Sequence, residues 1–225
     1  NVMAINHINN TILCGFMIEY LLVLFVFMIF GIWHLATSKD SFKRIFTSKF
    51  SLSLSSYTLI RIPVSLLLLG LTLYFVFLYR KTTPELFTPI KGLIRIVPPL
   101  IAMWLSSYVT LQISKADRLP QYFGVMDTPK VFFYEGAYSI CRHPLYFSWL
   151  LAVWGFIIAS PYLLYLEFAI LITIFVVHMS KEEEKVMIAL FGERYVDYTK
   201  RVPFLLPYGL LNKTTNMKLS KMNQQ

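Results

Sequence analysis

The sequence predicts an all-α fold, namely a polytopic membrane helical bundle of about five transmembrane helices that includes a C-terminal helical hairpin. First, 56% of the 225 residues are hydrophobic and only 15% are charged, whereas roughly 25% of the residues of a soluble domain are charged. Second, most apolar residues fall into blocks of about 18 to 25, long enough to cross a hydrocarbon core of about 30 Å. Third, the ~10-residue alternating segments of a spanning β-barrel are absent.

Each expected span corresponds to one apolar block. The first block is too long for the core of a signal peptide and has no basic segment before it, so we expect it to remain as a spanning helix. Only Ser160 and Pro161 separate the last two, shorter blocks, and because proline disfavours helix in the preceding residue, we expect a tight hairpin there. The blocks are residues 12–35, 57–79, 94–114, 145–159 and 162–179.

The order of the blocks predicts three parts. Residues 1–135 hold three spans and their connecting loops, and residues 136–210 hold the hairpin and a segment rich in charged and aromatic residues. Residues 211–225 form a polar tail that we expect to be disordered.

The net charge of +9 comes from 21 Lys and Arg against 12 Asp and Glu. The basic residues lie in short loops and in the tail, so the positive-inside rule explains them without a nucleic-acid partner. With the N-terminus outside, 17 basic residues lie inside and 4 outside, which predicts a cytoplasmic C-terminus in a chain surrounded by membrane lipids. Cys14, Cys141 and the four scattered His residues have neither a disulfide framework nor the spacing of a metal site.

Residues 136–207 hold most of the unusual side chains. The chain rises about 16 residues after Pro144 and descends about 17, so at helical rise it returns to nearly the same depth. We therefore expect Arg142 and His143 to lie close to the acidic run 182–184 at the cytoplasmic face.

Local signals sharpen this expectation. Pro144 suits the first position of a helix, which makes His143 its cap and leaves backbone N–H groups that can receive an anion. The last apolar block can continue as one helix through the acidic run to Phe191 and end at Gly192. One face of that helix would combine carboxylates with apolar side chains, which suits a ligand that is part cation and part apolar. Each residue taken alone also fits a solvated membrane interface.

Two acidic residues lie within spans, near their expected outer ends. An ionisable group in a membrane helix is a functional hypothesis by default. Glu19 and Glu167 could instead snorkel to the interface or pair with Arg80 or Arg95.

The motifs of the last third resemble a family of membrane enzymes. Gly-x-Tyr, Arg-His-Pro-x-Tyr, a hairpin, Glu-Glu, Phe-Gly-x-x-Tyr-x-x-Tyr and Val-Pro-x-x-x-Pro follow one another over about 70 residues. This order resembles the isoprenylcysteine carboxyl methyltransferase family and its bacterial relatives, which include phospholipid N-methyltransferases and methanethiol S-methyltransferases. Residues 33–38, followed by Lys43 and Arg44, resemble the thiol-methylating branch. Ser148 stands where the family commonly has Gly, and Met187 where it often has Leu.

The resemblance implies an integral membrane methyltransferase with a non-Rossmann fold and S-adenosylmethionine as cofactor. It implies that Arg142 and Glu184 orient the methyl acceptor, and that Tyr195 and Tyr198 close over the adenosine as a lid. The residues implied to hold the cofactor are His143, Pro144, Tyr146, Glu183, Tyr195 and Tyr198.

The implied acceptor is a lipophilic or small molecule with a thiol or carboxylate, which enters from the bilayer to a site at the cytoplasmic face. A phospholipid amine is an alternative acceptor. A non-enzymatic membrane protein that retains the fold, such as a small transporter or an assembly factor, is the alternative outside the enzymes. The sequence leaves the oligomeric state open.

Overall fold

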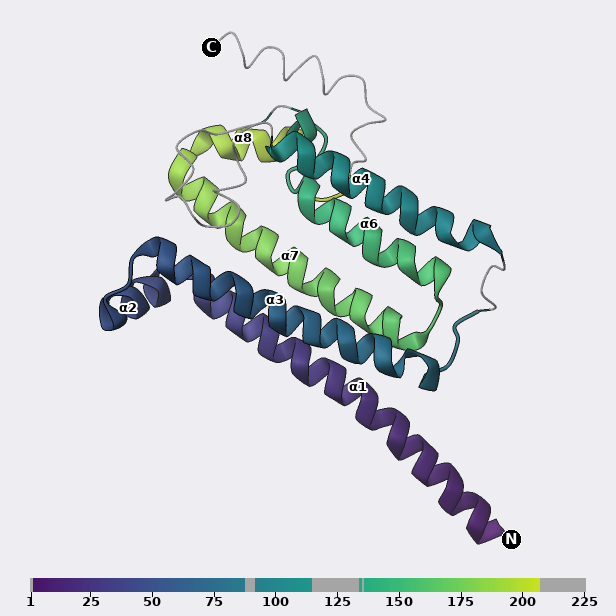
Figure 1. Ribbon diagram of the computed structural model, residues 1–225. Helices are drawn as coiled ribbons and strands as arrows, with labels where there is room; N and C mark the ends of the chain where they lie inside the picture. Colours follow the sequence, from purple (N-terminus) through teal and green to yellow (C-terminus); the bar gives the residue numbers. More distant parts are fainter. Residues whose placement is uncertain (1, 88–91, 115–133, 135, 207–225) are drawn as a thin grey trace. The chain divides into compact units, whose positions relative to one another are not determined.

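A computed structural model describes residues 2–87, 92–114, 134 and 136–206 (Figure 1). These residues form helices and short turns, with no β-strand among them beyond an isolated bridge between Glu85 and Tyr162. The expected all-α class is therefore confirmed, whereas the expected tail at 211–225 lies outside the described residues.

The α-helices of the described residues are α1 (Val2–Ser38), α2 (Asp40–Phe50), α3 (Leu54–Tyr79), α4 (Val97–Ser114), α6 (Pro144–Ala159), α7 (Leu163–Phe191) and α8 (Glu193–Arg201). Short 3-10 turns occupy Arg80–Thr82 (η1), Leu93–Ile96 (η2) and Gly136–Ser139 (η3).

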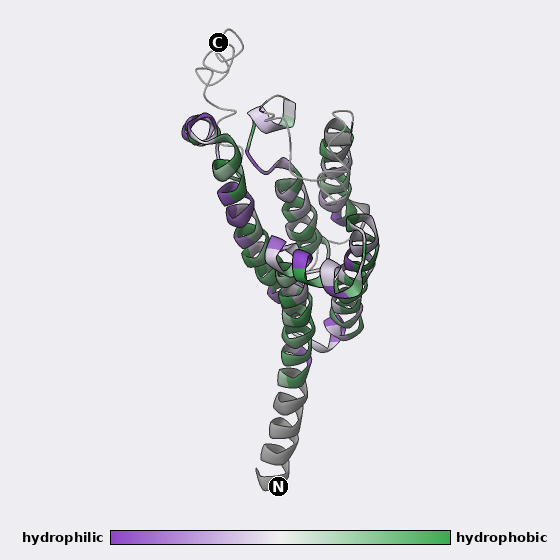
Figure 2. Cartoon of the chain, turned by 90° about the vertical axis from the view of Figure 1, so that its left-hand side faces the viewer, coloured by the Kyte–Doolittle hydropathy of each residue, from purple (hydrophilic) through white to green (hydrophobic). Residues whose placement is uncertain are grey.

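Three helices among the described residues are long and apolar enough to cross a membrane. They are Met17–Ser38, Leu54–Thr82 and Leu163–Phe191, with mean hydropathies of 2.0 to 2.2. Hydrophobic residues dominate the long helices in Figure 2. The other two expected spans correspond to shorter apolar helices, Val97–Val109 and Pro144–Ala159. The chain is thus an integral membrane protein with at least three helices of spanning length, and five spans remain a prediction.

The chain divides into two compact units. The first contains residues 1–95 and 156–175, and the second contains residues 96–155 and 176–225. Helices α6 and α7 each contribute residues to both units.

In the first unit, hydrogen bonds join α1 to the start of α3 and to the η1 turn that follows α3. The Tyr57 hydroxyl donates a buried hydrogen bond of 2.6 Å to the carbonyl of Thr37. At the other end, the Thr82 hydroxyl donates to the carboxylate of Glu19. The two hydrogen bonds fix how far one helix is shifted along the other.

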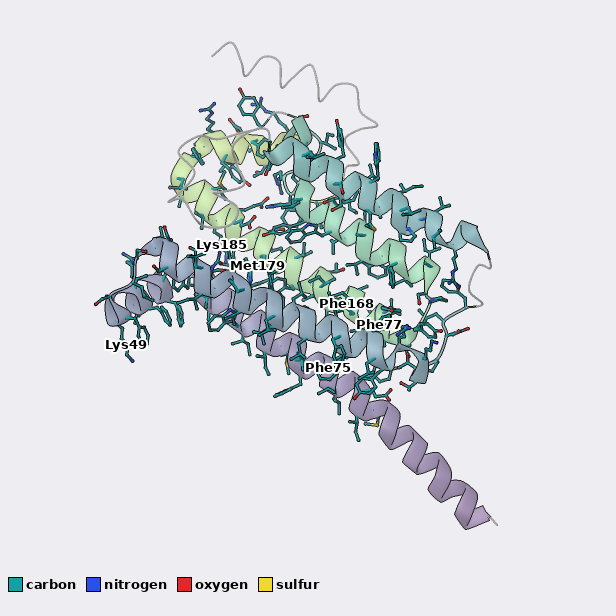
Figure 3. All side chains as sticks on the ribbon, in the orientation of Figure 1. Lys49, Phe75, Phe77, Phe168, Met179 and Lys185 are labelled. Carbon is teal, nitrogen blue, oxygen red and sulfur yellow. The ribbon has the colours of Figure 1, made fainter. Side chains whose placement is uncertain are left out.

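The first turns of α7 join the same unit. The amide of Leu163 donates to the carbonyl of Pro84 over 2.9 Å, which anchors the start of α7 to the segment after α3. The ring of Phe168 on α7, which Figure 3 labels, lies edge-on to Phe27 of α1 with centroids 6.2 Å apart. A backbone hydrogen bond and an aromatic contact therefore hold the start of α7 in this unit.

In the second unit, the expected helix boundaries at Pro144 and Phe191 are observed. The amide of Phe147 donates to the carbonyl of His143 over 3.0 Å, so His143 caps α6. Gly192 has a φ of 55°, a left-handed conformation that favours glycine, and the chain turns there into α8. This turn lets α8 leave the direction of α7 and pack beside it.

Candidate functional site

The candidate site centres on Glu184 of α7. One of its oxygens, Oε1, lies 2.6 Å from Nε of Arg142 and 3.2 Å from Nε2 of His143. The side chains of Arg142, His143 and Glu184 are only 12%, 6% and 17% exposed. The expected proximity of residues 142 and 143 to the acidic run is therefore observed, and one carboxylate holds two cationic partners.

Glu183, the preceding residue, faces the other nitrogen of the same imidazole. Its Oε2 lies 3.6 Å from Nδ1 of His143, an ion-pair contact that is too long for a hydrogen bond. Its Oε1 accepts a hydrogen bond from the Tyr146 hydroxyl. The rings of His143 and Tyr146 stack with centroids 5.9 Å apart. Because the Glu183 side chain remains 39% exposed, its carboxylate stays accessible to a ligand.

The local sequence explains why two adjacent glutamates meet one histidine. Consecutive residues of an α-helix point about 100° apart, since 3.6 residues make a turn. His143 stands at the N-terminus of α6, so its ring enters the angle between the two carboxylates. The two imidazole nitrogens then face Glu183 and Glu184 separately.

Arg142 is anchored to the end of α8. Its NH1 donates to the carbonyls of Thr199, at 2.6 Å, and Val202, at 3.2 Å. Its backbone amide donates to the carbonyl of Pro203 over 2.9 Å. The last carbonyls of a helix lack partners within the helix and carry partial negative charge, so a guanidinium satisfies them well.

The segment after α8 also contributes an aromatic wall, which the sequence reasoning missed. The ring of Phe204 lies 5.1 Å from the ring of His143 and 5.4 Å from the guanidinium carbon of Arg142. The Val-Pro-x-x-x-Pro motif at 202–207 contributed to the family resemblance, but Phe204 occupies one of its unspecified positions, so the motif predicted the segment and not this contact.

The charges in the cluster favour a protonated histidine. Burial lowers the pKa of His143, but its contacts with the Glu183 and Glu184 carboxylates and their negative charges outweigh burial, so the pKa is raised overall. Protonated His143 and Arg142 then balance the two carboxylates. Burial raises the pKa of Cys141 to about 11, so its thiol stays protonated and is a poor nucleophile.

Tyr195 and Tyr198 of α8 are packed inside the second unit. They are 3% and 1% exposed and form a cluster with Val202, against which Met187 and Phe191 pack. The Tyr198 hydroxyl donates to the carbonyl of Tyr138 over 2.6 Å. Burial raises the pKa of both phenols. For these rings to close over a ligand, as the resemblance implies, α8 would have to move.

The third acidic residue of the run, Glu182, forms an ion pair with Lys185 at 2.6 Å. Both side chains are well exposed, at 45% and 70%, and Figure 3 labels Lys185 on α7. Pro144 is buried at the start of α6. The structure therefore brings together Arg142, His143, Tyr146, Glu183 and Glu184, with Pro144 behind them.

Residues 93–194 match the family model described as phospholipid methyltransferase. The segment from Arg142 to Glu184 lies inside this match, whereas Tyr195 and Tyr198 lie just beyond it.

Several curated proteins are similar to parts of the chain. It is 37% identical over 81 residues to a methanethiol S-methyltransferase of Crocosphaera subtropica, a match covering 36% of this chain and 31% of that protein. It is 40% identical over 72 residues to a methanethiol S-methyltransferase of Pseudomonas deceptionensis, covering 31% and 26%. It is 37% identical over 78 residues to protein-S-isoprenylcysteine O-methyltransferase of Mus musculus, covering 33% and 26%.

These matches span less than a third of the length of each relative. No solved structure matches the chain significantly. The resemblance seen in the motifs, to this group of membrane methyltransferases, is confirmed for the matched segment.

Proposed function

We propose that the chain is an integral membrane methyltransferase that uses S-adenosylmethionine, with its site where the start of α6 meets the carboxylates of α7. The observation that carries the proposal is the position of Glu184, which binds Arg142 and His143 at once beside Glu183 and Tyr146. These residues lie within the segment that matches the family model.

The residues present fit the cofactor. S-adenosylmethionine carries a cationic ammonium, a cationic sulfonium and an anionic carboxylate, and it supplies the methyl group from its positively charged sulfur. The exposed carboxylate of Glu183, oriented by the Tyr146 hydroxyl, can receive a cation. Backbone N–H groups in the first turn of α6 can receive the carboxylate, and His143 and Pro144 set the direction of that turn.

Arg142 is the residue that we assign to the acceptor. Its guanidinium carries a permanent charge and is held rigidly by the carbonyls of Thr199 and Val202. A thiolate or carboxylate acceptor would pair with it. Glu184 holds both Arg142 and His143, so its contribution is to orient the acceptor through them. In an in-line displacement, alignment and exclusion of water are the main tasks of such residues.

Tyr195 and Tyr198 support this arrangement through packing. Their cluster with Val202 holds the end of α8, whose carbonyls in turn hold Arg142. For the two rings also to cover the adenosine as a lid, α8 would have to move.

The acceptor that we propose is a lipophilic or small thiol or carboxylate, reached from the bilayer at the cytoplasmic face. Relatives named for methanethiol and for isoprenylcysteine support this class. The description of the matching family supports a phospholipid amine as the alternative acceptor.

The first test is ligand-induced stabilisation of the purified protein. S-adenosylhomocysteine should raise the Tm, because a ligand that binds only the folded state stabilises it. Glu183→Gln should weaken this stabilisation, whereas Lys185→Ala, on the same helix but paired at the surface, should keep it. An unchanged Tm at saturating ligand would favour the non-enzymatic alternative.

The second test identifies the acceptor. Membranes that contain the protein are incubated with methyl-labelled donor and with a prenylcysteine, a small thiol or phosphatidylethanolamine in turn. We expect label on one of the first two, and transfer to the lipid amine alone would assign the phospholipid branch. Full turnover in both Arg142→Ala and Glu184→Gln would exclude this site.

A further inference from the structure

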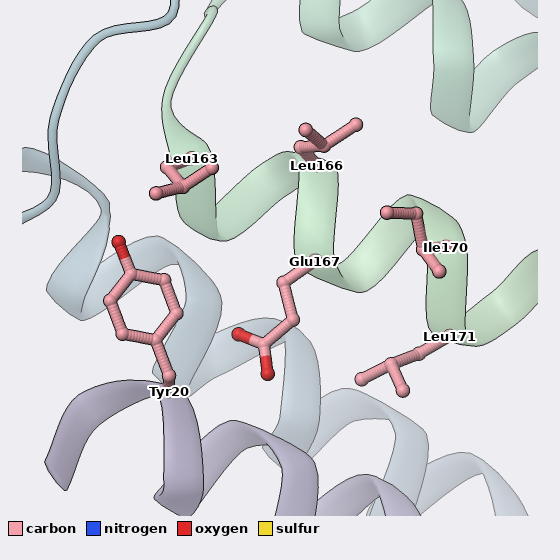
Figure 4. A pocket seen from close by; sticks show the side chains of 6 residues that line it. All are labelled: Tyr20, Leu163, Leu166, Glu167, Ile170 and Leu171. Atoms are coloured by element: carbon pink, nitrogen blue, oxygen red, sulfur yellow. The ribbon is translucent and has the colours of Figure 1, made fainter. Parts of the chain in front are cut away.

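A pocket of about 480 Å³ lies in the first unit (Figure 4). Two polar side chains, Tyr20 of α1 and Glu167 of α7, point into it from neighbouring helices. Apolar side chains of α7 complete its lining, namely Leu163, Leu166, Ile170 and Leu171.

The Glu167 carboxylate has a buried oxygen without a partner among the described residues. This atom, Oε2, accepts no hydrogen bond there. The Tyr20 hydroxyl is also buried and lies beside the Thr83 side chain. None of the ion pairs formed by the described side chains includes Glu167. This state of the oxygen is unusual, because a buried polar atom ordinarily has a hydrogen-bond partner.

The neighbouring charged groups are engaged elsewhere. The guanidinium of Arg80, a candidate partner from the sequence, lies 3.6 Å over the ring of Phe77 and donates to the carbonyl of that residue. Glu19 accepts a hydrogen bond from Thr82. Neither Arg80 nor Glu19 therefore satisfies the buried oxygen of Glu167, which remains able to accept a hydrogen bond from a ligand.

The remaining walls indicate what could fill it. Leu163, Leu166 and Leu171 are apolar, and Ile170 is 44% exposed on the open side. A ligand that satisfies Glu167 must donate a hydrogen bond, and a cation would also compensate the carboxylate charge. A ligand that covers the apolar walls must carry a hydrocarbon chain.

We propose that this pocket binds an amphiphile with a protonated primary amine head and an apolar chain. The ammonium donates to Oε2 of Glu167, the Tyr20 hydroxyl accepts a second hydrogen bond, and the chain lies along Leu166 and Ile170. All the residues that line this pocket belong to the first unit, and none of them is a residue of the candidate methyltransferase site. The pocket is therefore separate from the methyltransferase site, and the proposal does not depend on that function.

The test uses the full chain in a nonionic detergent, with dodecylammonium as the probe. Dodecanol and dodecyl sulfate carry the same chain with a neutral and an anionic head. We expect saturable binding of dodecylammonium by calorimetry, and at least about tenfold weaker binding of the other two, because a hydrogen bond to a charged group contributes strongly.

Two substitutions and a matched control locate the probe. Glu167→Gln should weaken dodecylammonium binding at least about tenfold, and Ile170→Trp should block the apolar side of the pocket. Glu19→Gln removes a neighbouring carboxylate that is already bonded to Thr82, and it should leave the affinity unchanged. The helix content and the cooperative thermal unfolding of each variant, measured by circular dichroism, serve as the folding check.

Two results would overturn the proposal. Equal affinities for the three probes would show an apolar groove without recognition of the amine. Unchanged binding in folded Glu167→Gln would place the amine elsewhere. Loss of S-adenosylhomocysteine binding in Glu183→Gln, with dodecylammonium binding retained, separates this test from the test of the methyltransferase.

Discussion

Helix α7 carries two acidic side chains in opposite states. Glu184 has two cationic groups within 3.2 Å of one oxygen. Glu167, earlier in the same helix, has a buried oxygen with no hydrogen-bond partner among the described residues. Burial disfavours both carboxylates, so the difference lies in what the neighbouring segments supply. A compensated carboxylate fixes its partners in place, whereas an uncompensated one remains able to bind a ligand.

Removal of Arg142 should have the largest effect. Arg142→Ala leaves Glu184 with His143 alone and deletes the hydrogen bonds to Thr199 and Val202. We expect the free energy of unfolding to fall by about 3 kcal/mol, because breaking a buried pair leaves an uncompensated charge. Turnover should fall by about 100-fold or more. Denaturation and labelled methyl transfer measure the two losses. Arg142→Lys, which keeps the charge but loses the planar fork, should lie between the wild type and Arg142→Ala.

The two glutamates should respond in opposite directions to the same substitution. Glu184→Gln should lower the free energy of unfolding by about 2 kcal/mol, because the ion pair with Arg142 and the charge-assisted hydrogen bond with His143 are lost. Glu167→Gln should leave it unchanged or raise it, since an uncompensated carboxylate disappears. Paired denaturation curves of the two variants check the difference. Equal losses would show that Glu167 has a stabilising partner after all.

The pH dependence should report on the compensated cluster. The pKa of His143 is raised in the folded state, so its stabilising contribution is complete below its unfolded pKa of about 6.5. That contribution should be lost as the pH rises through the folded pKa. Melting curves from pH 6 upward should therefore show a fall in Tm that is absent in His143→Gln. A parallel fall in both proteins would assign the effect to another group.

The packing beneath the cluster should contribute less. Tyr198→Phe removes a hydrogen bond to the carbonyl of Tyr138 but keeps the buried ring. We expect a loss of about 1 kcal/mol in the free energy of unfolding. If S-adenosylhomocysteine binding fell strongly while stability stayed the same, the lid role would be supported in place of the packing role.

The exposed ion pair on α7 should contribute least. Lys185 and Glu182 are 2.6 Å apart, but both are exposed. Lys185→Ala should change the free energy of unfolding by at most about 0.5 kcal/mol, because solvent screens the attraction. Denaturation at low and high salt measures the loss. A larger loss would show that solvent exposure does not explain why this pair should stabilise the fold less than the buried contacts of Glu184.

Local rules explain which parts of the site could be predicted. Proline at the first helical position and glycine at a left-handed turn depend on backbone geometry alone, so the ends at Pro144 and Gly192 follow from the sequence. The short turn between α6 and α7 limits where the chain can return, so Arg142 and His143 could be expected near the acidic run.

Other features depend on partners that are distant in sequence. The anchoring of Arg142 by Thr199 and Val202 depends on where α8 ends after the turn at Gly192. Tyr195, Tyr198 and Val202 stand at helical spacing i, i+3 and i+7, which predicts one apolar face. The spacing does not show whether that face packs inside the protein or lies at the membrane interface.

The sequence by itself determined the helical membrane character, the helix ends at Pro144 and Phe191, and the approach of the acidic run to Arg142 and His143. These follow from composition, backbone sterics and chain length, which act locally. Only the tertiary structure decided that Glu184 is compensated and Glu167 is not. The reason is physical, since the state of a buried charge depends on atoms a few ångströms away that belong to other segments of the chain.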